Sequence, residues 1–362
     1  MQKPENVAIA SVIIPVFNGE SLIERCVDNL LEQTYKDLEI IIVDDGSDDS
    51  TWEKCRKLKD ENGLLIKILH QNKLGVSAAR NKGIEEASGQ FLFFVDVDDL
   101  LEKDAIKKCV SIMETENCEL LVFGYFFDIK ENDSEIEHIE NSYNNTFFSD
   151  KDSFRQNLVD LYDANLMYNV WNKTFRKAII EEYNIRFPLG KPYNEDRDFI
   201  RDYIRVVNRV KVISDCFYHY VRTDNSTTGK YREELFEIRK EEYKRLGEFF
   251  ADIGLNDDKT KEFVARQHID RVVGCVENLF HVSGQKLTAA EKNYIKKKIK
   301  EIINDESTQE ALLRTNSRSK KMKVILVPYK MKNVEAVYLL MGMIYYIRSK
   351  NPKFFHKLKQ SR

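Results

Sequence analysis

Blocks of apolar and polar residues alternate along the first hundred positions, and their lengths match those of strands and helices. Four apolar runs of strand length cover residues 7–17, 38–47, 65–71 and 90–99. Three segments between them place apolar residues at helical spacing, at 18–33, 50–62 and 77–87. Continuous apolar runs are typical of strands buried on both faces, and strands that alternate with helices form parallel sheets. We therefore predict an α/β protein with a doubly wound, mostly parallel sheet flanked by helices.

The middle of the chain continues this pattern less regularly. After a helix that ends near residue 117, the apolar run at 120–129 predicts another strand. The polar insertion at 130–145 is expected to form a loop or a hairpin. Residues 150–185 are expected to be helical, with one break near Asn172.

The last third of the chain has a different composition. Lys, Glu, Arg and Leu dominate residues 231–310, and Gly and Pro are few, which predicts a helical C-terminal region. We place a domain boundary near residue 230, with the helical region at 231–316 and a separate basic tail at 317–362.

The basic tail changes the picture that the net charge of −3 gives. Residues 318–362 hold twelve Lys or Arg residues and one acidic residue, a charge of +11 that leaves −14 on residues 1–317. Their apolar stretch, 334–347, is about fourteen residues long, whereas a membrane-spanning helix needs roughly twenty. We expect a helix that lies on an anionic membrane surface, with Tyr345, Tyr346, Phe354 and Phe355 as anchors. A core helix with a solvated basic end and a contact between copies remain alternatives.

Composition excludes several classes of protein. The 32% of charged residues and the mean hydropathy of −0.49 argue against a membrane-spanning bundle. Six scattered cysteines without a C-x-x-C pair fit neither a disulfide framework nor a zinc site, which favours a reducing compartment. The N-terminus lacks the features of a signal peptide, so a cytoplasmic protein is expected. No nucleic-acid reader motif accompanies the basic tail, and we expect no nucleic-acid partner.

Acidic residues follow two of the predicted strands directly. Ligands of open α/β sheets bind at the carboxyl ends of the strands, where Asp45 and the segment F-V-D-V-D-D lie. A carboxylate such as Asp45 can accept the imide N–H of uracil, although D-D-G-S also suits a turn with a helix cap. Asp96 and Asp98 share one side of an extended segment, and two such carboxylates suit Mg²⁺ or Mn²⁺ held together with substrate phosphates.

Two further polar segments are candidates for binding or catalysis. Lys73 stands just before a predicted helix, and the backbone amides near Ser77 lie where that helix begins. Arg80 follows one turn later. Basic side chains and amides at the start of a helix suit the binding of a phosphate. The motifs of Walker and dinucleotide-binding loops are absent from the chain. The cluster N-E-D-R-D at 194–198 stands where a helix begins, and dipole complementarity alone accounts for acidic residues there.

Six motifs occur in one order within residues 9–228: S-V-I-I-P-V-F-N-G-E, V-D-D-G-S, G-V-S-A-A-R-N-K-G, F-V-D-V-D-D, W-N-K-T-F-R and N-E-D. Together they resemble the family 2 glycosyltransferases, in particular bacterial enzymes of capsule, exopolysaccharide and teichoic-acid assembly. The resemblance implies the GT-A fold, with a Rossmann-like nucleotide-sugar-binding part at about 1–105 and an acceptor part at about 106–230. It also implies an inverting, metal-dependent transfer from a nucleotide sugar, with UDP-sugars expected.

The resemblance assigns expected roles to individual residues. On the donor side, the nucleotide-sugar-binding residues are Pro15, Val16, Glu20, Asp45, Lys73, Arg80, Asp96 and Arg222. Asp98 resembles the direct metal ligand, assisted by Asp96 and, on weaker grounds, by His219. Asp196 is similar to the general base, and Glu195 beside it orients acceptor or metal. Trp171, Asn172 and Lys173 match a segment that lines the acceptor side.

The same resemblance bears on the kind of transfer and on the rival interpretation. Processive relatives carry Q-x-x-R-W, which requires a Trp that this chain lacks after Trp171, so transfer of single sugars is expected. The acceptor is expected to be a glycan or a lipid-linked molecule at the inner face of the cell membrane. An inactive nucleotide-sugar-binding scaffold remains the alternative. The sequence leaves the donor sugar, the linkage and the oligomeric state open.

Overall fold

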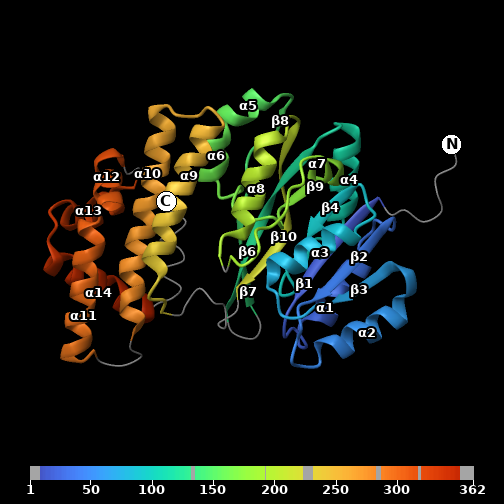
Figure 1. The fold of residues 1–362 in the computed structure, drawn as a ribbon, viewed down its shortest axis with the longest axis horizontal. Helices are drawn as coiled ribbons and strands as arrows, with labels where there is room; N and C mark the ends of the chain where they lie inside the picture. The colour runs from blue at the N-terminus through green and yellow to red at the C-terminus, as the bar shows by residue number, and fades with distance from the viewer. Residues whose placement is uncertain are drawn as a thin grey trace. The chain divides into compact units, whose positions relative to one another are not determined.

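The computed structural model describes residues 9–131, 135–191, 193–222, 231–282, 287–316 and 319–350. The chain divides into two compact units, residues 1–224 and 225–362 (Figure 1). The first unit is α/β and the second is helical, as the sequence predicts. The division falls within a few residues of the expected boundary, whereas the expected boundary at 316/317 lies inside the second unit.

Ten strands form one sheet among the described residues of the first unit. They are β1 (Ala10–Val16), β2 (Leu38–Asp44), β3 (Ile66–His70), β4 (Phe91–Phe94), β5 (Leu100–Leu101), β6 (Leu120–Glu131), β7 (Glu135–Asn141), β8 (Thr146–Phe148), β9 (Lys173–Arg176) and β10 (Val210–Arg222). The order along the sheet is β3-β2-β1-β4-β9-β6-β10-β5, with β7 on β6 and β8 on β10.

The N-terminal half of the sheet is parallel because its strands are buried on both faces. Every residue of β1, β2 and β4 is buried, and β1 pairs in parallel with both β2 and β4. The chain reaches the sheet edge at β3 and then returns to β4 on the other side of β1. This reversal places the carboxyl ends of β1, β2 and β4 beside one another, at the point where doubly wound sheets bind ligands.

Eight α-helices in the described part of the first unit connect and cover these strands. They are α1 (Ile23–Leu31), α2 (Thr51–Asn62), α3 (Val76–Glu86), α4 (Ala105–Thr115), α5 (Lys151–Gln156), α6 (Leu158–Asp163), α7 (Lys177–Glu182) and α8 (Glu195–Val206). Helix α1 contacts α2, whereas α3 packs on β1 and β2. Right-handed crossovers put α3 on the face opposite α1 and α2, because the chain changes direction along the sheet after β3.

The second half of the sheet differs from the expected pattern. Residues 150–185, expected to be helical, include strand β9 between α6 and α7. Strand β9 is antiparallel to both β4 and β6 and joins the two halves of the sheet, so pairing with distant strands overrides local pattern there. Within the insertion at 130–145, the described strand β7 pairs antiparallel with β6, in keeping with the hairpin alternative.

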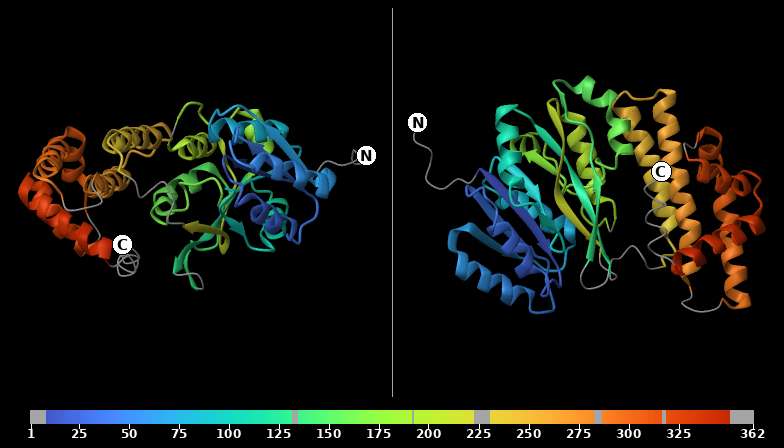
Figure 2. Two further views of the ribbon diagram at one scale, coloured as in Figure 1. Left: turned by 90° about the horizontal axis from the view of Figure 1, so that it is seen from below. Right: turned by 180° about the vertical axis from the view of Figure 1, so that it is seen from behind.

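The second unit consists of α9 (Leu235–Asp252), α10 (Asp258–Asn278), α11 (Ala289–Asn304), α12 (Glu306–Arg314), α13 (Lys320–Lys330) and α14 (Val334–Lys350), which Figure 2 shows from two further sides. Helix α11 begins at a capping box in which Thr288 and Glu291 satisfy each other's backbone amides. The helices share one apolar core.

The segment expected to be a separate tail belongs to this core. Tyr329 of α13 and Val337 and Met341 of α14 are fully buried in it, so one face of each helix packs inward. The opposite faces expose apolar side chains, namely Val324, Val327, Met331, Leu339, Met343, Tyr346 and Ile347. No described helix is both long and apolar enough to span a membrane. Phe354 and Phe355 lie outside the described residues.

Candidate functional site

Arg80 joins the carboxylates that the sequence places far apart. Its Nη2 lies 2.9 Å from Asp96 Oδ1, and its Nη1 lies 3.0 Å from Glu195 Oε1 and 2.6 Å from Asp196 Oδ1. Arg80 comes from α3, Asp96 follows β4, and the other two carboxylates open α8. The Arg80 side chain is only 4% exposed. The fold therefore builds a half-buried site of three carboxylates around one guanidinium.

Burial changes the protonation of Asp196. Loss of solvent raises the pKa of Asp196 to about 7, the Arg80 charge acts against this rise, and the Glu195 and Asp96 charges add to it. A carboxyl with a pKa near neutrality can exchange a proton at physiological pH. Asp196 is thus suited to accept a proton from a bound hydroxyl.

The loop after β4 is held by a buried aspartate that the sequence analysis left without a role. Asp99 accepts hydrogen bonds from the Tyr218 hydroxyl (2.7 Å) and the Val221 amide (2.9 Å). The same hydroxyl accepts from the Asp96 amide at 3.1 Å. Burial, followed by the charges of Asp96 and Asp98, raises the pKa of Asp99 well above its usual range. Asp99 is the third acid of D-V-D-D, which was the only signal for it in the sequence.

Asp98 stands in the same loop, half-buried and close to Asp96. Burial, and next the Asp96 charge, raise the pKa of the Asp98 carboxyl. The Arg25 guanidinium donates to the Asp98 carbonyl at 2.5 Å and fixes the backbone there. Two carboxylates that oppose each other's ionisation gain from a cation between them, so this donor set fits a hard divalent ion.

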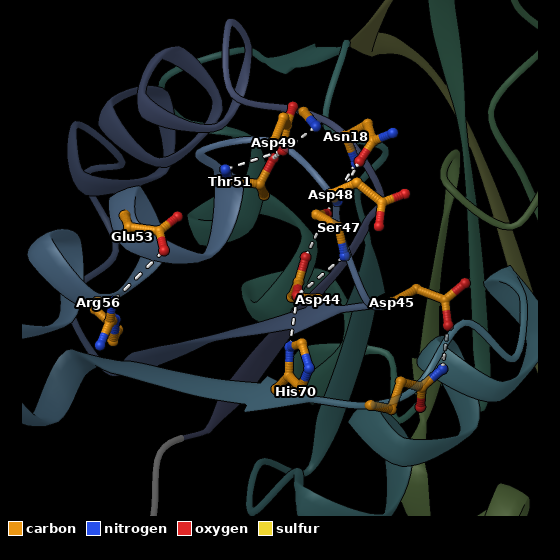
Figure 3. Close-up of polar contacts among 12 residues, drawn as sticks. Asn18, Asp44, Asp45, Ser47, Asp48, Asp49, Thr51, Glu53, Arg56 and His70 are labelled. Carbon is orange, nitrogen blue, oxygen red and sulfur yellow. Dashed lines mark hydrogen bonds and ion pairs between the residues drawn. The ribbon is translucent and has the colours of Figure 1, made fainter.

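Asp44 and Asp45 at the end of β2 point to different partners (Figure 3). Asp44 binds Ser47 and, at 2.7 Å, His70. Asp45 accepts from Gln71 Nε2 (2.7 Å) and from the amides of Leu74 (2.8 Å) and Gly75 (2.9 Å). Asp45 therefore stands at the end of β2 and also holds the loop that leads to α3.

An exposed aromatic residue that the sequence analysis missed lies beside this loop. Phe17 follows β1 directly, and the Lys73 ammonium lies 4.1 Å from its ring centroid. Pro15 and Val16 are buried in β1, and the Glu20 carboxylate accepts from the Ser50 amide at 3.1 Å. Of these expected donor-side residues, Glu20 and Lys73 are exposed, and the exposed ring of Phe17 lies beside Lys73.

Two buried polar atoms of α3 have no hydrogen-bond partner within the described part of the chain. They are the Ser77 hydroxyl and Arg80 Nε. Buried donors without partners are rare and often mark a place that a ligand completes. Both stand in the first turns of α3, next to the residues named above.

The residues expected to line the acceptor side are buried instead. Asn172 and Lys173 are fully buried. The Lys173 ammonium donates to the carbonyls of Leu166 and Asn169, and burial lowers its pKa to about 7. Trp171 stacks on Tyr218, with centroids 4.3 Å apart. These three residues form the framework of the site, because Asn172 and Lys173 donate to backbone carbonyls of the loop before β9 and Trp171 packs on Tyr218.

Of the two remaining candidates, His219 does not join the carboxylate site. His219 hydrogen-bonds to Asp128 and Glu102, both at 2.9 Å, rather than to Asp98. Consecutive residues of a strand face opposite sides, so His219 faces away from the side on which Tyr218 meets Asp99. The side chain of Arg222 lies outside the described residues.

Comparisons with known proteins agree on one family. Residues 11–183 match the model of Glycosyl transferase family 2. The uncharacterized glycosyltransferase EpsJ of Bacillus subtilis is 27% identical over 250 residues, which cover 69% of this chain and 72% of EpsJ. A poly(ribitol-phosphate) beta-glucosyltransferase of Bacillus spizizenii is 32% identical over 218 residues, 58% of this chain and 32% of the relative.

A solved structure shares the fold over most of the chain. The crystal structure of Staphylococcus aureus TarS 1–349 in complex with UDP-GlcNAc superposes with a TM-score of 0.61 at 19% identity, covering 92% of this chain and 90% of that one. The likeness therefore includes helices of the second unit as well as the unit that contains the sheet.

Proposed function

Because this chain belongs to the family 2 glycosyltransferases, with the GT-A fold, we propose that it transfers single sugars from a UDP-sugar to a hydroxyl group, with inversion at the anomeric carbon. The proposed acceptor is a glycan or a lipid-linked molecule of bacterial surface polysaccharide synthesis. The observation that carries the proposal is the contact of Arg80 with Asp96 on one side and with Glu195 and Asp196 on the other. This contact joins the donor end of the sheet to a base.

Asp196 is the proposed general base. With a pKa of about 7, it is half ionised at neutral pH and can take the proton of the acceptor hydroxyl during attack. Glu195 shares Arg80 with it and orients the acceptor. A single displacement by that hydroxyl, opposite the leaving diphosphate, inverts the configuration.

Asp98 and Asp96 are the residues that would hold Mg²⁺ or Mn²⁺. The bound ion would act as a Lewis acid and offset charge on the leaving diphosphate. Arg80, which is always charged, reinforces this by orienting the Asp96 carboxylate. Asp99 and Tyr218 hold the backbone of the loop and so position Asp96.

The donor is proposed to bind over the ends of β1 and β2. Asp45 is the proposed acceptor for the imide N–H of uracil, and Phe17 offers an exposed ring for stacking. Lys73, together with Ser77 and Arg80 Nε, supplies donors for the diphosphate. TarS, whose fold is similar, was crystallised with UDP-GlcNAc, which supports a UDP-sugar here.

The decisive experiment measures UDP release over a panel of UDP-sugars, with and without Mn²⁺. Wild type is compared with Asp98→Asn, Asp196→Asn and the matched control Asp202→Asn. Asp202 lies in α8, as Asp196 does, and pairs with Arg205. We expect at least a hundredfold loss for the first two variants, dependence on metal, and little change for the control. Full turnover of Asp98→Asn and Asp196→Asn, or without metal, refutes the mechanism. UDP binding without turnover on any donor, tested with a panel of acceptors, favours the inactive scaffold.

A peripheral position at the inner face of the cell membrane is proposed for the second unit. The exposed faces of α13 and α14 carry apolar residues at helical spacing, for example Leu339, Met343 and Ile347, and lysines flank them. Apolar faces with a basic border bind anionic lipid. The six unpaired cysteines are in keeping with a reducing compartment.

Point variants test this better than truncation, because α13 and α14 complete the core of the second unit. Leu339→Glu is compared with the control Leu313→Glu, which changes an exposed leucine of α12. In co-sedimentation with vesicles containing 30% phosphatidylglycerol, we expect Leu339→Glu alone to weaken binding at least fivefold. Equal binding of both variants contradicts the membrane position.

A further inference from the structure

Three neighbouring strands bring two histidines and one aspartate together away from the carboxylate site. Asp128 of β6 lies directly across from His138 of β7, and β6 also pairs with β10, which carries His219. Asp128 Oδ1 lies 2.6 Å from His138 Nδ1, and Asp128 Oδ2 lies 2.9 Å from His219 Nδ1. One ligand atom from each residue lies within 4.8 Å of the others.

This cluster occupies the face of the sheet opposite Asp99. Tyr218 and Tyr220 stack on Trp171 on one face of β10. His219, between them in sequence, stacks on Phe126 on the other face, with centroids 4.7 Å apart. The cluster is therefore separate from the groups proposed to act on the donor sugar.

We infer that Asp128, His138 and His219 form a binding site for a divalent transition metal, with Zn²⁺ as the best fit. Two imidazoles and one carboxylate suit zinc, whereas Mg²⁺ prefers oxygen ligands alone. Three protein ligands leave a fourth position for water. The inference goes beyond the proposed sugar transfer and does not depend on it.

The surroundings of His219 support coordination through Nδ1. Its other nitrogen, Nε2, lies 2.9 Å from Glu102 Oε1. Histidines that bind metals usually donate their second ring N–H to a carboxylate, which fixes the tautomer and orients the ring. Glu102 occupies that position, which would leave the Nδ1 lone pair for an ion bound beside Asp128.

Access and spacing also suit an ion. The side chain of Asp128 is 5% exposed and that of His219 is 16% exposed, whereas His138 is 49% exposed and offers an entry path. Tetrahedral zinc with bonds of about 2.1 Å needs donor atoms about 3.4 Å apart. The distances from the Asp128 oxygens to the two imidazole nitrogens must therefore lengthen by less than about 1 Å. Rotation of the exposed His138 side chain can supply this change on its side.

Bound metal would join three strands. Among the described strands, β7 pairs with β6 alone. Coordination by His138 and His219 would connect β7 to β10 across β6. Slower amide exchange in β7 on addition of Zn²⁺ is the expected physical consequence.

Zinc binding to the chelator-treated full-length protein tests the site. Asp98→Asn serves as the background, so that the proposed Asp96–Asp98 site contributes less, and either His138→Gln or Asp128→Asn is added to it. The control adds His70→Gln, because His70 also pairs with one aspartate, at 2.7 Å, and is 45% exposed. The measurements are equilibrium dialysis with Zn²⁺ at pH 7.5 and the visible spectrum with Co²⁺.

We expect the background protein to bind one Zn²⁺ per chain and to give the intense visible bands of four-coordinate Co²⁺. His138→Gln and Asp128→Asn should each weaken binding at least tenfold, and His70→Gln should change it less than twofold. Absence of zinc binding by the background protein, or equal binding by His138→Gln and His70→Gln, overturns the inference. Loss of turnover in Asp98→Asn is a separate readout that concerns the proposed function alone.

Discussion

Replacement of Arg80 by methionine removes the guanidinium that lies between Asp96, Glu195 and Asp196 and leaves an uncharged side chain that replaces the aliphatic part of arginine. Breaking a buried ion pair from one side costs about 3 to 5 kcal/mol, because the partner charges stay without compensation. The three carboxylates are partly exposed and can recruit water, which favours the lower end. We expect Arg80→Met to lower the free energy of unfolding by about 3 kcal/mol at pH 8.

The same variant should show a characteristic dependence on pH. Burial raises the pKa of Asp196 to about 7 in the folded protein, and the Arg80 charge holds it from rising further. A carboxyl whose folded pKa exceeds its unfolded pKa opposes folding as pH increases. Each unit by which loss of Arg80 raises this pKa adds about 1.4 kcal/mol to the cost at high pH, and adds little near pH 6, where Asp196 is protonated in both proteins. The cost should therefore be about 1 to 2 kcal/mol smaller at pH 6.

Urea titration followed by tryptophan fluorescence measures this difference. Both tryptophans, Trp52 and Trp171, belong to the first unit, so the signal reports the unit that contains Arg80. Arg56→Met is the control, because its exposed pair with Glu53 should contribute less than about 0.5 kcal/mol. A cost for Arg80→Met no larger than that of the control, or one that grows on acidification, would refute the reasoning.

Three other predictions address the base, the donor loop and the turn after β2. The kcat/KM of the wild type, measured with the donor that the panel identifies, should rise about tenfold from pH 6 to pH 8, since Asp196 must be ionised and its pKa is about 7; a flat profile contradicts its role as base. Asp45→Ala should weaken UDP binding at least tenfold in calorimetry, because the proposed acceptor for the uracil imide is removed and three donors of the neighbouring loop lose their acceptor. An unchanged Kd would contradict any role of Asp45 in donor binding. Gly46→Ala should lower the free energy of unfolding by about 1 to 3 kcal/mol in urea titrations, because Gly46 has φ +73° and a Cβ would lie 2.9 Å from the backbone nitrogen of Lys73. Gly63→Ala should lower it less, because Gly63 has φ +58° and open space around the Cβ position.

The alternation of strands and helices in the first hundred residues was determined by the sequence alone. Buried strands and amphipathic helices have distinct periods that can be recognised within a dozen residues. The strand-end acids Asp45 and Asp96 followed from the same pattern, because parallel strands end at one edge of the sheet. The family resemblance added Asp196, whose surroundings no local pattern specifies.

Only the tertiary structure decided which groups meet. Arg80 reaches Asp196 across 116 residues of sequence, and β9 is a strand because β4 and β6 flank it. Burial of Asn172 and Lys173, and the orientation of His219 toward Asp128, likewise depend on pairing between distant strands. Local periodicity states which face of an element is apolar, but the partner that covers this face comes from elsewhere in the chain, and that partner sets the burial, the charge environment and the pKa of each group.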